Sequence, residues 1–361
     1  MHVIRDDGSL DPTLDPGLSV DQVVALYKAM VRTRVVDDRL EKIQRQGRIA
    51  FHVGSLGEEA AIIGAAAALR DRDWIVPCYR EVGALLWRGY PLQQYIDHMY
   101  GNADDPLRGR QMPDHTFSRA HRYLSVSAPI GTQIPHAVGV AMAAKKRGLL
   151  DECVGVFFGD GATSSNDFHA AMNFAAVYEA PVLFLCRNNG YAISLPTQRQ
   201  TATRTLAEKA AAYRIPAARI DGNDVLAVWR AVREGAERAA NQGGPTFIEL
   251  ITYRLGGHST SDDPRVYRSQ EETDSWRKLD PLLRLRKHIE QRTAWNDDLD
   301  GDWRAVCDAE VKECVRRAEE KPPPELGDMF GDVYAEQPWH LREQQAQCLG
   351  GPRASDEEDE S

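Results

Sequence analysis

Residues 154–194 read VGVFFGDGATSSNDFHAAMNFAAVYEAPVLFLCRNNGYAIS, and this stretch decides the fold. It contains two apolar runs, 153–158 and 181–186, on either side of a helical pattern over 166–178. Continuous apolar strands are typical of a parallel sheet whose two faces are both covered by helices. The stretch therefore predicts a strand, a helix and a second, parallel strand.

The same alternation continues on both sides of this stretch. We expect further helices at 132–147, 203–213 and 224–241, and further strands at 216–220 and 246–252. Strands that alternate with helices indicate a sheet with helices on both faces. The sequence thus predicts an α/β fold, a doubly wound and mainly parallel sheet with helical extensions at both ends.

Outside this core the sequence predicts an extended N-terminal arm, an α/β domain and a C-terminal arm that ends in an acidic tail, with bounds 1–18, 19–320 and 321–361. Ser19, followed three residues later by Gln22, predicts a capping box at the start of a helix that ends near Gly47. A short strand, WIVP, is expected after Asp73, and further helices are expected at 57–69, 281–292 and 302–320. The polar stretch 255–272 is too long for a simple connection, which favours a functional or a disordered loop.

Composition narrows the class of protein. The chain has 361 residues and a formal net charge of -10, which argues against nucleic acid or an anionic membrane as the main partner. No apolar run approaches the roughly 20 residues that a membrane-spanning helix needs. The six cysteines form no CxxC pair, so we expect reduced thiols. The opening residues, MHVIRDDGSLDP, lack the features of a signal or transit peptide, which predicts a cytoplasmic protein, with a trimmed organellar form as the alternative.

Two polar side chains follow the two strands of the opening stretch. Asp160 stands between Gly159 and Gly161, and Asn189 closes the second strand. Ligands of open α/β sheets bind at the carboxyl ends of the strands. A carboxylate and an amide suit Mg²⁺ or Ca²⁺, and Mg²⁺ often completes its coordination with phosphate oxygens. The pair therefore predicts a metal-bound diphosphate ligand, while the structural alternative is a helix cap and an ordinary turn.

A Gly-Asp-Gly segment followed about 30 residues later by Asn-Asn resembles the thiamine diphosphate signature. Five further segments resemble the α subunit of the branched-chain 2-oxo acid dehydrogenase decarboxylase component: GRQMPDH (109–115), APIGTQIP (128–135), CRNNGYAIS (186–194), DGNDV (221–225) and TYRLGGHSTSDD (252–263). The resemblance covers about residues 20 to 345. It implies that the fold is of the thiamine diphosphate-binding type.

The resemblance also implies a set of site residues. Mg²⁺ would be held by Asp160, Asn189 and the backbone carbonyl of Tyr191. The cofactor-binding positions are Tyr79, Arg80, Ala128, Gly161, Ala162, Arg187 and His258, and His258 is also the catalytic candidate. Ser127, Pro129, Thr132 and Gln133 match positions that bind K⁺. Ala128 stands where relatives often have serine, so a hydrogen bond made there by the serine would be missing.

The implied activity is the decarboxylation of a branched-chain 2-oxo acid and transfer of the acyl group to a lipoyl domain of an acyltransferase core. The implied assembly has two α and two β subunits, and the glutamate that activates the cofactor would come from the β subunit. The acids of the LGEEAA segment, Glu58 and Glu59, therefore receive no role. Ser259 and Ser269 match phosphorylation positions in relatives, and a capping role is an equal alternative.

Three other functions compete with this one. The nearest is the α subunit of a pyruvate or acetoin dehydrogenase, against which RQMPDH, IGTQIPHA and NNGYAIS resemble the branched-chain pattern more closely. A non-catalytic nucleotide- or phosphate-binding protein could use the same acid at the end of a strand. A purely structural scaffold would need neither Asp160 nor Asn189 for activity.

Overall fold

The centre of the molecule is a parallel sheet of five strands. The computed structural model describes residues 1–149, 151–331 and 333–351, so the predicted acidic tail, SDEEDES (355–361), lies outside the described residues. The strands run in the spatial order β1-β2-β3-β7-β6 and all pair in parallel. Their bounds are Trp74–Val76 (β1), Val154–Gly159 (β2), Val182–Asn188 (β3), Ala217–Asp221 (β6) and Thr246–Ile251 (β7). A short antiparallel pair, β4 (Tyr191–Ala192) and β5 (Leu195–Pro196), follows β3.

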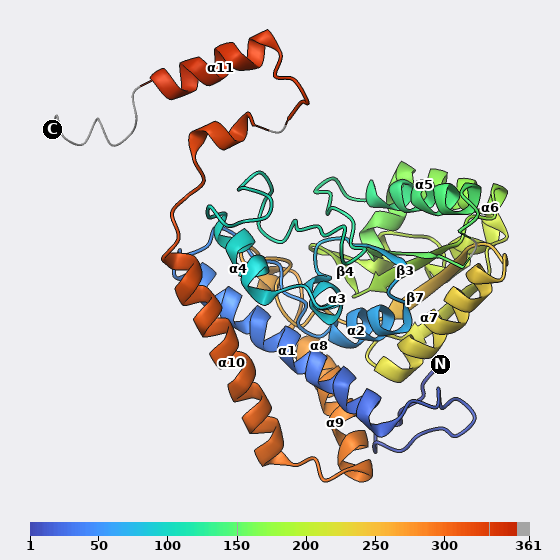
Figure 1. Ribbon diagram of the computed structural model, residues 1–361. Coiled ribbons are helices and arrows are strands. Elements are labelled where there is room, and N and C mark those ends of the chain that lie inside the picture. Colours follow the sequence, from blue (N-terminus) through green and yellow to red (C-terminus); the bar gives the residue numbers. More distant parts are fainter. Residues whose placement is uncertain (150, 332, 352–361) are drawn as a thin grey trace.

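Helices cover both faces of the sheet, as predicted (Figure 1). One face carries α5 (Gln133–Lys146) and α6 (Asn166–Val177), and the other carries α2 (Glu59–Ala68) and α7 (Val225–Ala240). Successive side chains of a strand point to opposite faces. Accordingly, Leu183 and Leu185 belong to the hydrophobic core that includes α2 and α7, while Phe184 belongs to the core under α5 and α6. The doubly wound α/β fold is confirmed.

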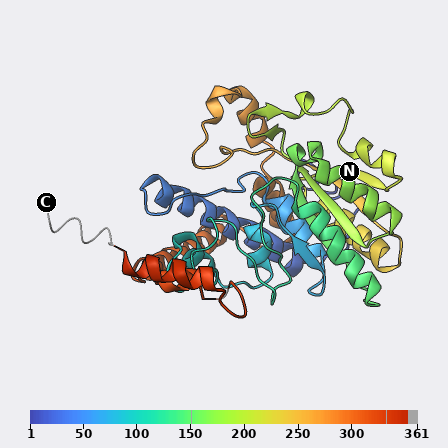
Figure 2. The same cartoon turned by 90° about the horizontal axis from the view of Figure 1, so that it is seen from above.

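The remaining helices extend the domain beyond the α2 layer. They are α1 (Val20–Arg45), α3 (Val82–Trp87), α4 (Leu92–Tyr100), α8 (Gln270–Arg277), α9 (Pro281–Arg292) and α10 (Asp297–Glu319). The predicted capping box of Ser19 and Gln22 begins α1. A further helix, α11 (Trp339–Gly350), stands away from the body, and Figure 2 shows it at the end of the molecule opposite the sheet.

Several local predictions were wrong. The helix expected at 203–213 is only a 3₁₀ segment, Ala207–Tyr213, and α10 begins at Asp297 rather than at residue 302. Helices α3, α4 and α8 were not predicted, because short helices leave little periodicity to detect. Helix α11 was not predicted either, and it has no buried residue that would require an apolar face. The polar stretch after Leu255 contains the start of α8 and is therefore partly regular.

The N-terminal arm is packed rather than extended. Ile4 pairs with Leu10 in an antiparallel bridge, and Val3 is buried. The backbone N–H groups of Val3 and Ile4 donate to Oδ2 of Asp224 at 2.6 and 2.7 Å. The other oxygen of Asp224 caps α7, so one buried carboxylate joins the arm to the domain.

The cysteines are unpaired, as predicted, and Cys78, Cys153, Cys186 and Cys307 are buried. Within residues 1–149, 151–331 and 333–351, no helix is long and apolar enough to cross a membrane.

A tight turn before α2 gives a testable stability prediction. Gly57 has φ +93°, and a Cβ at this position would lie 2.3 Å from the carbonyl oxygen of Tyr253. Gly57→Ala is therefore expected to destabilise the protein by about 1–3 kcal/mol from the backbone conformation alone, with the steric clash adding to that. Urea denaturation measures the change. Gly301→Ala is the control, because Gly301 lies in α10 with open space around it, and it is expected to gain about 0.5–1 kcal/mol. Equal stability of the Gly57 variant and the unmodified protein would contradict the prediction.

Candidate functional site

The candidate site lies at the carboxyl ends of β2 and β3. Asp160 begins a 3₁₀ turn directly after β2, and Asn189 directly follows β3. Both are buried, with exposed fractions of 1% and 5%. A cavity of about 270 Å³ opens here. Its lining includes most of the residues predicted for the site: Tyr79, Arg80, Asp160, Gly161, Ala162, Arg187, Asn189, Tyr191 and His258.

Asp160 is a buried carboxylate without an ion-pair partner among the described residues. Its Oδ2 accepts hydrogen bonds from Nε2 of Gln200 at 2.5 Å and from the hydroxyl of Thr197 at 3.4 Å. Burial raises the pKa of this carboxyl above its ordinary value, and the Gln200 hydrogen bond opposes that effect. A cation beside Asp160 would favour the charged form.

The amide of Asn189 is oriented by its neighbours. Its Nδ2 donates to Oε1 of Glu58 at 3.0 Å, and its Oδ1 accepts from the backbone N–H of Tyr191 at 3.3 Å. The carbonyl of Tyr191 accepts from Nη1 of Arg254 at 3.3 Å. The amide nitrogen is thus occupied by an acid, which leaves the amide oxygen as the group able to bind a metal.

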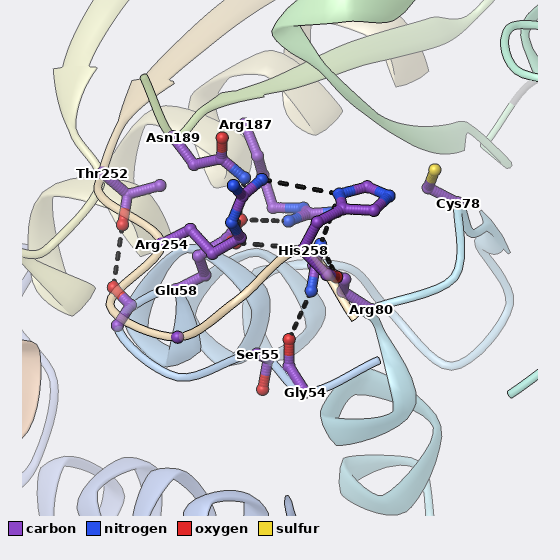
Figure 3. Close-up of polar contacts among 12 residues, drawn as sticks. Gly54, Ser55, Glu58, Cys78, Arg80, Arg187, Asn189, Thr252, Arg254 and His258 are labelled. Atoms are coloured by element: carbon purple, nitrogen blue, oxygen red, sulfur yellow. Dashed lines mark hydrogen bonds and ion pairs between the residues drawn. The ribbon is translucent and has the colours of Figure 1, made fainter. Parts of the chain in front are cut away.

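Three buried guanidinium groups surround the cavity (Figure 3). Arg187, at the end of β3, forms ion pairs with Glu58 and Glu81 through its two terminal nitrogens. Its Nε has no hydrogen-bond partner among the described residues. Arg80 donates to the carbonyls of Gly54 and His258, each at 2.6 Å.

Arg254, which follows β7, donates to the carbonyl of Ile193 at 2.7 Å and to the Tyr267 hydroxyl at the same distance. The Nε of Arg254 is buried and unpaired within the described part of the chain. Arginine binds phosphate oxygens in pairs because its guanidinium is a planar fork. The three groups therefore make this cavity suitable for a phosphate-bearing ligand.

His258 stands over the same cluster. Its Nδ1 lies 3.2 Å from Nη2 of Arg80 and 3.5 Å from Nη1 of Arg254. Burial, reinforced by Arg80 and Arg254, lowers the pKa of His258 to about 4, so the ring is neutral at pH 7. Because Nδ1 faces two obligate donors, it acts as an acceptor and the ring proton lies on Nε2.

The four residues predicted for K⁺ lie in the loop before α5 and at the start of α5. The hydroxyl of Thr132 donates to Oγ of Ser127 at 2.7 Å and lies 2.9 Å from the carbonyl oxygen of Pro129. Gln133 donates to the carbonyl of Phe157, and its buried Oε1 has no partner among the described residues. Ala128 is exposed and does not line the cavity.

The sequence analysis missed three charged residues that belong to the site. Glu58, Glu81 and Arg254 received no role from the sequence, although each has direct contact with a predicted site residue. The sequence signal that could have identified the two acids is a charge within an apolar segment, since Glu58 lies in LGEEAAII and Glu81 in REVGALL. Buried charges of this type are almost always paired.

The polar side chains of the cavity fit a metal ion whose coordination is completed by phosphate oxygens. The described residues contain no group of three or more histidines, cysteines or acids that could hold a metal alone. The carboxylate of Asp160 and the amide oxygen of Asn189 are hard oxygen atoms of the kind that Mg²⁺ prefers, and the guanidinium groups are donors of the kind that bind phosphate. Gly161 leaves no room for a side chain, since a Cβ would lie 2.7 Å from Cβ of Ala192.

Comparison with known proteins gives consistent results. The family model described as "Dehydrogenase E1 component" matches residues 27–327. The chain is 44% identical over 342 residues to the mitochondrial 2-oxoisovalerate dehydrogenase subunit alpha of Bos taurus, covering 94% of this chain and 75% of the relative. The same subunit of Homo sapiens is also 44% identical, with 94% and 77% covered. Subunit alpha 2 of Arabidopsis thaliana is 46% identical over 346 residues, with 95% and 73% covered.

These relatives contradict one prediction. All three are mitochondrial proteins, so the cytoplasmic location predicted from the opening residues was wrong. That prediction rested on the lack of leader features in MHVIRDDGSLDP.

Proposed function

This chain belongs to the dehydrogenase E1 component family, and we propose that it is the α subunit of a branched-chain 2-oxo acid dehydrogenase. Membership implies thiamine diphosphate as the cofactor. The observation that carries the proposal is the cavity in which Asp160 and Asn189 meet buried guanidinium groups at the ends of adjacent parallel strands. Identity of 44% to 2-oxoisovalerate dehydrogenase α subunits supports the branched-chain substrate over pyruvate.

Each part of the cavity receives a role. Asp160, the amide of Asn189 and the carbonyl of Tyr191 hold Mg²⁺ through hard oxygen atoms. Arg80 and Arg187, with Tyr79, Gly161 and Ala162, surround the diphosphate. Arg254 joins this set because its buried Nε has no partner in the described part of the chain.

The loop before α5 is proposed to bind K⁺ through Ser127, Pro129, Thr132 and Gln133. The unpaired, buried Oε1 of Gln133 supports this assignment, since a buried acceptor without a partner is costly. Ala128 is exposed and lies outside the cavity lining, so we do not propose it as a cofactor-binding residue.

Thiamine diphosphate, when bound, supplies the electron sink for decarboxylation of the 2-oxo acid. The residues of this chain bind and orient it and exclude water. Neutral His258 offers an N–H donor at Nε2 to the reacting group, because its Nδ1 is held by Arg80. Asp262 fixes the loop, since its Oδ2 accepts from the backbone N–H of His258 at 2.6 Å.

An α subunit of a multienzyme complex works with a β subunit and an acyltransferase core. We propose an assembly of two α and two β subunits in which the β subunit provides the glutamate that activates the cofactor. Glu58 is a poor candidate for that glutamate because it is occupied by Arg187 and Asn189, and Glu59 pairs with Arg34 instead.

The loop serines have structural roles here. Oγ of Ser269 accepts from the backbone N–H of Glu272 at 3.1 Å and caps α8. Oγ of Ser259 accepts from the N–H of Ser261 at 3.3 Å. Phosphorylation of these serines stays a prediction that mass spectrometry of the native protein would decide.

Substrate preference tests the proposal. The chain is expressed together with its β subunit, and turnover of 2-oxoisovalerate and of pyruvate is measured with a lipoyl domain as acceptor. We expect kcat/KM for 2-oxoisovalerate to be larger by about 10–200-fold, the discrimination that extra methyl groups give in an apolar pocket. A preference for pyruvate would assign the chain to the pyruvate branch of the family. Thiamine-dependent decarboxylation by the α chain alone would contradict the proposed β subunit contribution.

A further inference from the structure

The structure assigns to Glu58 a positioning role that couples the metal side of the site to the phosphate side. Glu58 is a fully buried acid at the N-cap position of α2, and its two carboxylate oxygens contact two different functional groups (Figure 3). Oε1 accepts from Nδ2 of Asn189 at 3.0 Å, and Oε2 forms the ion pair with Arg187. This inference rests on the proposed function, because it concerns how the site holds Mg²⁺ and a diphosphate.

The contact with Asn189 decides which end of the amide faces the metal. An amide has a donor end and an acceptor end, and only the oxygen binds a hard cation. Glu58 can accept but not donate when ionised, so it must bind Nδ2. The oxygen of Asn189 is thereby left for the metal. Without the carboxylate, the amide could turn and present its N–H₂ group to the cation.

The contact with Arg187 fixes the phosphate side. Glu58 and Glu81 each contact one terminal nitrogen of Arg187, and its Nε has no hydrogen-bond partner among the described residues. Arg80 approaches the same carboxylate, with its Nε 3.8 Å from Oε1 of Glu58. Glu81 differs from Glu58 in that it contacts Arg187 and the backbone N–H of Cys78 but not Asn189.

The backbone around Glu58 is held rigidly. The N–H of Glu58 donates to the carbonyl of Ser55 at 2.8 Å. The Thr252 hydroxyl donates to the carbonyl of Gly57 at 2.8 Å, which ties the turn to the chain just after β7. Although Glu58 occupies the N-cap position of α2, its side chain does not cap that helix. The carboxylate is therefore directed to the site by a clamped turn and has no local hydrogen-bonding role.

The test measures thermodynamic coupling between Mg²⁺ and thiamine diphosphate. The α chain is purified in complex with its β subunit, and calorimetry gives Kd for thiamine diphosphate in excess Mg²⁺ and in EDTA. The ratio of the two constants is the coupling factor. We expect Glu58→Gln to lower this factor by about 10–100-fold, the effect of losing a group that orients a metal ligand. General damage to the site would instead weaken binding equally in both conditions.

Two matched variants separate the contacts. Glu81→Gln removes an acid that contacts Arg187 but not Asn189, and it is expected to change both constants by similar factors. Glu59→Gln changes the neighbouring acid, which pairs with Arg34 away from the cavity, and is expected to leave the coupling factor unchanged. If the Glu58→Gln complex does not assemble, Glu58→Asp is measured instead. It keeps the charge but shortens the side chain by one methylene, and the coupling factor is again expected to fall.

The outcomes are distinguishable. An unchanged coupling factor in the Glu58 variants, or an equal loss in Mg²⁺ and in EDTA, overturns the positioning role while the proposed function stands. If the unmodified complex shows no Mg²⁺-dependent binding of thiamine diphosphate, the proposed function itself fails, and this inference fails with it.

Discussion

Asp160→Asn is expected to reduce decarboxylation by the assembled complex by about 10³-fold. Loss of a residue that hydrogen-bonds to a metal ligand and orients it costs about 10–100-fold in metal affinity. Loss of the charge of the ligand itself is expected to cost more. Asn keeps the size and can keep the hydrogen bond to Gln200, but it removes the negative charge that we propose neutralises Mg²⁺. Steady-state turnover of 2-oxoisovalerate at several Mg²⁺ concentrations measures the effect. We expect partial recovery of turnover as the Mg²⁺ concentration rises.

The same variant is expected to be at least as stable as the unmodified protein without cofactor. Burial raises the pKa of Asp160 in the folded state above the value of 3.8 that an exposed aspartate has. A raised carboxyl pKa contributes stability that is present below pH 3.8 and is lost as the pH rises through the folded pKa. At pH 7 the folded protein therefore carries the cost of a buried charge, which Asn removes. Thermal unfolding of the two cofactor-free proteins at pH 7 gives the comparison.

A large drop in melting temperature for the Asn variant would indicate that Asp160 holds the fold and not the metal. Serine at the neighbouring Gly161 is no substitute control, because its Cβ would contact Ala192. Asp167→Asn is a better one, since Asp167 lies in the first turn of α6 outside the cavity lining. It is expected to leave turnover and its Mg²⁺ dependence unchanged.

The sequence was most informative where side chains repeat a pattern. Strands β2 and β3 are continuous apolar runs, so their positions and their parallel pairing could be predicted within two residues. Asp160 and Asn189 then had to lie at one edge of the sheet. The capping box at Ser19 was equally predictable, because it depends on residues only three apart.

Contacts between distant segments could not be predicted. Glu58 meets Arg187 and Asn189 across more than 125 residues of chain, and nothing in LGEEAA shows which of its two acids turns inward. Glu59 turns the other way, to Arg34. The direction is decided by the clamped turn at Gly57, whose close approach to Tyr253 exists only in the folded protein. Arg254 was not predicted for the same reason, because its contacts with the carbonyls of Tyr191 and Ile193 join segments that are distant in the sequence.

His258→Ala is expected to lower kcat of the assembled complex by about 10²–10⁴-fold, the usual contribution of a positioned proton donor or acceptor. Binding of thiamine diphosphate should change far less, because Arg80 also donates to the backbone carbonyl of residue 258, which the substitution keeps. Steady-state turnover and calorimetry on the same preparation measure kcat and Kd, respectively. A parallel loss of binding and of kcat would point to a role in holding the cofactor alone.

Two conservative variants of His258 identify which ring nitrogen is needed for activity. Glutamine places an N–H₂ group near the position of Nε2, while asparagine places an acceptor near Nδ1. If Nε2–H is the functional donor, His258→Gln retains more activity than His258→Asn.

The pH dependence of kcat gives an independent check. Burial and the neighbouring guanidinium groups lower the pKa of His258 to about 4, so its neutral form is complete above pH 6 and is lost only as the pH falls toward 4. The kcat of the unmodified complex should therefore fall at acid pH with a midpoint near pH 4. This acid limb should be absent from the pH profile of His258→Gln. A limb near pH 6.5, the pKa of an ordinary histidine, would contradict the lowering of the His258 pKa by burial and by Arg80 and Arg254.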